Sequence, residues 1–169
     1  MYKRIILFFV FASVTALCFA QVGTTWTNFD GLIGEWVGDG TGQPGQGSGT
    51  FTFSYDLGNK ILVRKGHTTF PKTENKAETI HDDLMVVYAE YPGAPLKAVY
   101  FDNEGHTISY TVQCVEKSII LTSSKMPNVP IFRLTYTLLD KNVINTKFEM
   151  SRDGEKFNAY LEGKSKKVN

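Results

Sequence analysis

Apolar residues alternate with polar ones in a series of short runs that continue through most of the chain. Phe51, Phe53 and Tyr55 alternate with threonine and serine, and residues 107–113 and 131–138 repeat the pattern. Alternation with a period of two gives a β-strand one apolar face and one polar face. A chain that repeats it this often is constrained to an all-β fold in which each strand buries one face.

The runs predict about ten strands, separated by turn sequences. The strands are expected at residues 34–40, 49–57, 60–70, 82–90, 96–102, 106–114, 117–124, 131–139, 142–150 and 156–164. The segments between them carry Gly, Asn and Asp, which suit the tight turns of hairpins. Consecutive strands should therefore pair antiparallel with their neighbours in the sequence.

A flat sheet of so many strands would leave two exposed edges, and closing the sheet removes them. A two-layer sandwich is the alternative, but it needs longer crossovers than this chain offers. A short helical turn is expected at residues 28–34, with Asn28 or Asp30 as its N-cap. We therefore predict a single closed antiparallel up-and-down β-barrel that follows a short N-terminal helical turn.

The N-terminus has the layout of a secretory signal peptide. Lys3 and Arg4 precede an apolar run that ends before Gln21, and this run is too short to favour a membrane span. We predict a signal peptide over residues 1–20, a barrel domain over residues 21–169, and export to the periplasm or the extracellular space.

The two cysteines bear on the location and on the redox state of the chain. Cys18 lies where a bacterial lipoprotein carries its acylated cysteine, but Leu17 stands where that chemistry prefers a small residue. A lipid anchor is therefore the lesser alternative. After cleavage only Cys114 remains, so the domain cannot form an intramolecular disulfide and must depend on its packed core.

Charge and motifs argue against several functional classes. The net charge is +1, and loss of Lys3 and Arg4 brings it to −1, which gives no basic excess for nucleic acid. Residues 40–45 fit G-x-G-x-x-G, but a strand is expected after them, where a dinucleotide site requires a helix. The sequence holds no recognisable catalytic constellation, so we do not expect an enzyme.

The motif Gly-Glu-Trp-Val-Gly-Asp-Gly at residues 34–40 resembles the Gly-x-Trp signature of calycin barrels, which include the lipocalins. Its longer form is closest to the nitrobindin-like haem-binding barrels. The resemblance implies that the ring of Trp36 closes one end of a barrel. It also implies a haem-binding histidine in the last strands, but the chain has no histidine after His106. Haem is therefore disfavoured, and no cofactor is predicted.

A barrel of this size can enclose one small ligand, so the predicted partner is a small apolar or lipid-like molecule. Arg133 has the opposite parity to its apolar neighbours and should face outward, although a register shift of one residue would turn it inward toward a ligand carboxylate. The sequence leaves the orientation of Arg133 open. The candidate cavity residues are Trp36, Phe53, Tyr55, Tyr88, Tyr110, Arg133, Tyr136 and Phe148.

A polar set is expected at one rim of the barrel. Antiparallel pairing of the strands at 82–90, 96–102 and 106–114 would bring together His81, Asp83, Asp102 and His106. Two histidines and two carboxylates are a possible metal or acid–base set. In the alternative reading Asp102 caps the turn and the histidines are solvated; we assign no metal and no catalytic residue here.

Four functions follow, in decreasing order of support. They are a small-ligand-binding module, an envelope protein with a filled barrel, a haem binder and an enzyme. Fold alone does not separate a ligand cavity from a filled barrel. Ligand identity and oligomeric state stay open.

Overall fold

The computed structural model describes residues 25–39, 48–74 and 76–168. The predicted signal peptide, Cys18 and the glycine-rich motif at 40–45 lie outside the described residues. In the described part of the chain, no helix has the length and apolar character needed to cross a membrane.

Ten strands follow one short helix. The elements are the 3₁₀-helix η1 (Trp26–Leu32) and the strands β1 (Gly34–Gly38), β2 (Ser48–Asp56), β3 (Ile61–Phe70), β4 (Thr79–Tyr88), β5 (Lys97–Asp102), β6 (Thr107–Val115), β7 (Ser118–Ser123), β8 (Ile131–Asp140), β9 (Val143–Ser151) and β10 (Asn158–Lys167).

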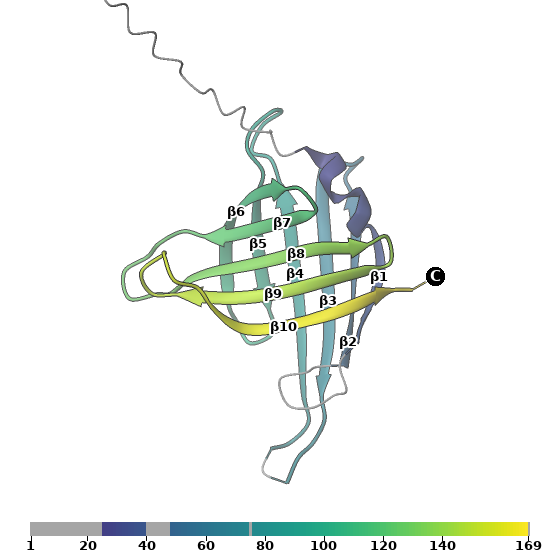
Figure 1. The fold of residues 1–169 in the computed structure, drawn as a ribbon, viewed down its shortest axis with the longest axis vertical. Coiled ribbons are helices and arrows are strands. Elements are labelled where there is room, and N and C mark those ends of the chain that lie inside the picture. Colours follow the sequence, from purple (N-terminus) through teal and green to yellow (C-terminus); the bar gives the residue numbers. More distant parts are fainter. Residues whose placement is uncertain (1–24, 40–47, 75, 169) are drawn as a thin grey trace, which may run out of the picture.

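The strands form a closed antiparallel barrel, which confirms the predicted architecture (Figure 1). Each strand pairs with its neighbours in the sequence, and β1 pairs with β10 to complete the circle. In Figure 1, β7–β10 cross in front of β3 and β4 at a steep angle, and the β3–β4 hairpin extends beyond the barrel. The architecture is compatible with a calycin-like barrel.

Two strands have a bound that differs by three residues from the sequence prediction. β4 begins at residue 79 and not at 82, because its pairing with β3 continues out to Phe70 opposite Thr79. His81 therefore lies within a strand and not at its start. β10 ends at residue 167 and not at 164, because its last residues pair with β1 and complete the barrel.

The helix η1 covers one end of the barrel. It starts at Trp26, with Thr25 and not Asn28 as its N-cap, and the Asn28 side chain accepts a hydrogen bond from the Thr25 N–H. Its apolar side chains Phe29 and Leu32 are buried in the core. Trp36 is fully buried and its Nε1–H donates to the Leu32 carbonyl at 2.7 Å. This end of the barrel is therefore closed by aromatic and aliphatic side chains.

The turn between β9 and β10 supplies a test of pH dependence. Asp153 Oδ1 accepts hydrogen bonds from the backbone N–H groups of Lys156 and Glu155 and from the Ser151 hydroxyl, which lower the pKa of Asp153 to about 2. A depressed pKa contributes stability above the unfolded value near 3.8, and this contribution disappears as the pH falls through about 2. The stability advantage of wild type over Asp153→Asn in urea titrations should therefore shrink between pH 4 and pH 2.

The same urea titrations of wild type and Asp153→Asn can contradict this expectation. Other carboxylates also titrate in this range, so the quantity to follow is the difference between the two proteins and not the stability of either one. A difference that stays constant across that interval would show that Asp153 titrates normally in the folded chain.

Candidate functional site

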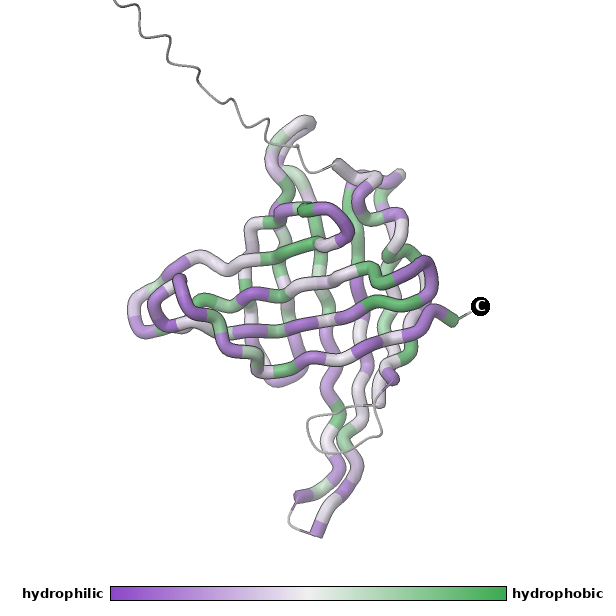
Figure 2. The backbone as a smooth tube through the Cα atoms, in the orientation of Figure 1, coloured by the Kyte–Doolittle hydropathy of each residue, from purple (hydrophilic) through white to green (hydrophobic). Residues whose placement is uncertain are grey.

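The turns after β3, β5, β7 and β9 lie at the end of the barrel away from η1, because the strands alternate in direction. We call this the open end. Figure 2 shows that these turns are mostly hydrophilic. The core cluster takes residues from η1 and from each of β1–β9, and none of the described residues of β10 belongs to it. The inner wall therefore carries buried apolar side chains on β1–β9 and none on the described residues of β10.

Four of the predicted cavity residues fill the barrel interior. Trp36, Phe53, Tyr110 and Tyr136 are all buried in the core cluster. The Phe53 ring meets the Tyr136 ring edge-on, with 5.2 Å between their centroids. The Tyr55 hydroxyl turns toward η1 and lies 2.7 Å from both the Trp26 carbonyl and the Asp30 carboxylate. These residues pack against one another, so any interior space must lie elsewhere.

Two of the predicted cavity residues lie on the outer face. Arg133 faces outward, as the alternation indicated: its Nε donates to Glu149 Oε2 at 2.8 Å and its guanidinium lies 3.8 Å from the centre of the Phe157 ring. The hydrogen bond from Arg133 holds the pKa of the buried Glu149 below its usual value. Tyr88 follows the buried Val87 in β4, and alternation places it outside as well. Both are therefore removed from the cavity set.

The remaining cavity residue, Phe148, belongs to a half-buried aromatic wall. Its ring stacks on Phe132 with 5.7 Å between centroids, and Tyr160 meets it edge-on at 6.2 Å. Beside them the inner face of β10 is exposed at Leu161 and Gly163 and buried at Ser165. Leu161, opposite Phe148, is 38% accessible, and a Cβ built on Gly163 would have no atom within 4 Å. The interior is open beside β10.

The opposite wall carries an inner ion pair between Arg64 of β3 and Asp83 of β4. Their side chains are only 13% and 7% exposed. The Arg64 guanidinium also lies 4.8 Å from the centre of the Phe51 ring. A Cβ at Gly66 would collide with Asp83 and lie 2.9 Å from Arg64 Nη1, so the pair requires glycine there. Arg64 Nε is buried and has no hydrogen-bond partner.

The β5–β6 turn presents a second polar group beside this pair. Asp102 Oδ1 accepts hydrogen bonds from the backbone N–H groups of Glu104 and His106 at 3.0 and 2.9 Å. The Asn103 side chain donates to the Ile80 carbonyl and accepts from the Asp82 N–H, which docks the turn on β4. Asp102 therefore does cap the turn, and the capped turn holds Glu104 and His106 beside His81.

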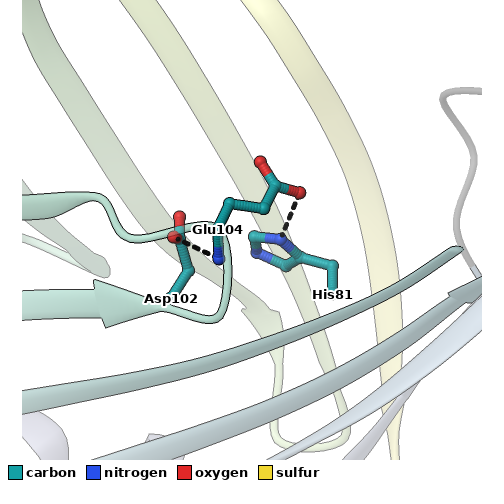
Figure 3. Close-up of side chains that lie close together, drawn as sticks. All are labelled: His81, Asp102 and Glu104. Atoms are coloured by element: carbon teal, nitrogen blue, oxygen red, sulfur yellow. Dashed lines mark hydrogen bonds and ion pairs between the residues drawn. The ribbon is translucent and has the colours of Figure 1, made fainter.

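The side chains of His81, Asp102, Glu104 and His106 form what we call the rim cluster. His81 Nδ1 lies 3.3 Å from Glu104 Oε1 (Figure 3). The Nε2 atom of His81 lies 3.0 Å from the Tyr100 hydroxyl. His106 Nδ1 lies 2.9 Å from Asp102 Oδ2. His81 Nε2 is 4.0 Å from Asp83 Oδ2, which connects the rim cluster to the ion pair. The four residues predicted for the rim, which are His81, Asp83, Asp102 and His106, are thus brought together.

Hydrogen bonding sets the ionisation of the rim cluster. Burial acts to raise the pKa of Asp102, but hydrogen bonds from the His106 backbone and ring and from the Glu104 N–H bring it below the usual value. The bond to Asp102 raises the pKa of His106. Burial raises the pKa of Tyr100 well above its usual range, so its hydroxyl is protonated and can donate to Asp102 or His81.

Three residues of this region were missed as site residues. Arg64 and Tyr100 were not considered, and Glu104 was treated as part of the turn. Tyr100 shares its parity with Asp102, so alternation along β5 was a usable signal. Arg64 follows three consecutive apolar residues, Ile61 to Val63, so the sequence does not show which face of the strand is the apolar one. Its inward direction follows only from the register with β4.

Two surface hollows border these walls. One, of about 340 Å³, is lined by Met150 and Asn158 among others and lies at the open end beside the aromatic wall. The other, of about 400 Å³, is lined by the outward-facing Lys65, Leu84 and Phe101 and also by Asp83 and Asp102 of the inner polar wall. The first takes Asn158 from β10, at the strand end that lies beside the aromatic wall.

No known protein family matches the chain, and no curated protein matches it in sequence.

Proposed function

We propose that this protein is an exported small-ligand-binding barrel that takes a molecule with an apolar body and one polar group. The observation that carries the proposal is the exposed inner face of β10 in a barrel whose other strands contribute buried core residues. A filled barrel would be expected to bury Leu161 and to leave no space beside Gly163. The ligand would enter at the open end and lie along β10.

Unpartnered polar groups support a polar group on the ligand. Arg64 Nε and Thr146 Oγ1 are buried without a hydrogen-bond partner, and Thr146 lies opposite Gly163 on β9. Buried polar groups in folded proteins are nearly always paired, so an unpaired one requires an explanation. A ligand carboxylate or hydroxyl would pair with one of these two groups, while Phe148 and Leu161 would contact its apolar part.

The likeness to calycin barrels supports the same proposal. The Gly-x-Trp motif and the closed barrel agree with a calycin-type relative, and the buried Trp36 takes the position that such a relationship implies. The nitrobindin-like haem alternative is less well supported. His67, His81 and His106 each lie within 3.3 Å of a carboxylate oxygen and none lies in β7–β10. The last strands, where the resemblance implies an axial histidine, therefore have none.

Filling the open space beside β10 tests the proposal. The probe is a dansyl-labelled long-chain fatty acid, followed by fluorescence on titration of the purified protein. Gly163→Leu places a side chain where no atom stands within 4 Å, so it should fold normally and weaken probe binding at least about tenfold, as loss of a buried apolar contact does. Lys164→Leu, on the outer face of the same strand, is the matched control and should bind as wild type does.

Two outcomes would contradict the proposal. The first is an absence of saturable binding by the wild-type protein, together with an absence of co-purified ligand in native mass spectrometry. The second is equal probe affinity in Gly163→Leu and wild type, which would place any bound probe outside the barrel. Either result would favour the alternative of a scaffold with no ligand.

A further inference from the structure

We propose that the rim cluster is a binding site for a zinc-like divalent cation, with His81, Asp102 and Glu104 as ligands and His106 hydrogen-bonded to Asp102 beside them. The three ligands each offer one donor atom, and these atoms lie within 4.8 Å of one another. Imidazole nitrogens together with carboxylate oxygens are a donor set that zinc accepts in proteins. The proposal is independent of the small ligand proposed for the interior.

The donor spacing suits a tetrahedral ion. Donors about 2.0–2.1 Å from a tetrahedral zinc ion stand about 3.3 Å apart. His81 Nδ1 and Glu104 Oε1 have this spacing already, at 3.3 Å. His106 Nδ1 lies 2.9 Å from Asp102 Oδ2 and 3.8 Å from Glu104 Oε2. The Glu104 side chain is 60% exposed, so it has the freedom to complete the shell.

The turn around Asp102 prearranges the site. The two backbone N–H groups that Asp102 accepts hold its carboxylate in place, and the docking of Asn103 on β4 fixes the distance from the turn to His81. The side chain of Asp102 is only 4% exposed. Strand and turn geometry thus hold His81 and Asp102 in place. Metal binding needs to order only the exposed side chain of Glu104.

Charge also favours a cation here. Asp83, Asp102 and Glu104 supply three carboxylates in this connected group, and Arg64 is its one permanently charged cation. The carboxylates of this group therefore outnumber its permanent cation, and a divalent ion beside Asp102 and Glu104 would offset part of that excess.

A second histidine–carboxylate pair lies nearby and serves as the internal control. His67 Nδ1 is 2.6 Å from Asp82 Oδ1, with both side chains more than half exposed on the neighbouring strands. No third donor is grouped with them among the described residues. The pair therefore offers the same donor types as the rim cluster, but no third donor is grouped with it among the described residues.

Isothermal titration with ZnCl2 of the purified, chelator-treated protein tests the proposal. Wild type should bind one zinc ion per chain, and Co²⁺ in its place should give the visible absorption of a tetrahedral complex. His81→Ala and Glu104→Gln should each weaken zinc binding by more than about tenfold, since even outer partners of metal sites cost that much. His67→Ala should bind zinc as wild type does.

Circular dichroism and urea denaturation establish that each variant is folded, which keeps the zinc result interpretable. The proposal is overturned by an absence of stoichiometric zinc binding to wild type. It is equally overturned if folded His81→Ala and Glu104→Gln keep wild-type affinity, or if His67→Ala loses as much affinity as they do.

Discussion

Replacing Trp36 with alanine is expected to lower the free energy of unfolding by about 3–5 kcal/mol, the usual cost of removing a fully buried large aromatic side chain. The ring is 0% exposed and stacks on Phe51 with 6.5 Å between centroids. The substitution also leaves the Leu32 carbonyl without its donor. Urea denaturation followed by circular dichroism measures the loss directly.

Trp36→Phe is the matched control for this experiment. It keeps much of the apolar packing and removes the indole N–H, so it should cost clearly less than alanine does. A loss below about 1 kcal/mol for Trp36→Ala would mean that the ring does not close the barrel end. In that case the likeness to calycin barrels would lose its main physical support.

Breaking the inner ion pair is the second large effect that we expect. Asp83→Ala leaves the Arg64 guanidinium inside the barrel without a carboxylate, and removal of one partner from a buried pair typically costs about 3–5 kcal/mol. The double variant Arg64→Leu/Asp83→Leu removes both charges and should be close to wild type in stability, since apolar replacements of buried pairs are often neutral or better. Denaturation of the single and double variants checks both expectations.

The double variant also separates stability from ligand binding. If Arg64 meets the polar group of a ligand, the stable double variant should lose affinity for the dansyl fatty acid. Comparable stability losses in the single and double variants would show that the pair itself stabilises the fold. Retained probe affinity in the double variant would leave Arg64 without a part in binding.

Much of the fold could be predicted because the strands in the second half of the chain alternate clearly. The runs around Phe132 and Phe148 placed β8 and β9 within one residue of their observed bounds, and they favoured the outward direction that Arg133 takes. The turn residues between them identified the hairpins. Closure followed from the number of strands and not from any one residue.

The inner polar wall could not be predicted in the same way. β3 and β4 each contain a run of consecutive apolar residues, and such a run does not say which residues face inward. The register, with Gly66 opposite Asp83, decides that Arg64 and Asp83 share the interior. The end of the last strand could not be predicted either, because residues 162–167 are mostly charged or small and give no apolar face.

The short seam between β1 and β10 has a consequence for the order of folding. Trp36, Val37 and Gly38 pair with Lys167, Lys166 and Ser165 of the last strand, and one backbone hydrogen bond flanks the pairing on each side, from Asp39 to Lys164 and from Val168 to Glu35. The two halves of this seam are more than a hundred residues apart in the sequence, so joining them carries the largest loop-closure entropy of any strand pair in the molecule. The ten strands can assemble from neighbour to neighbour as a curled ribbon, but an inside exists only once the two outermost strands have met.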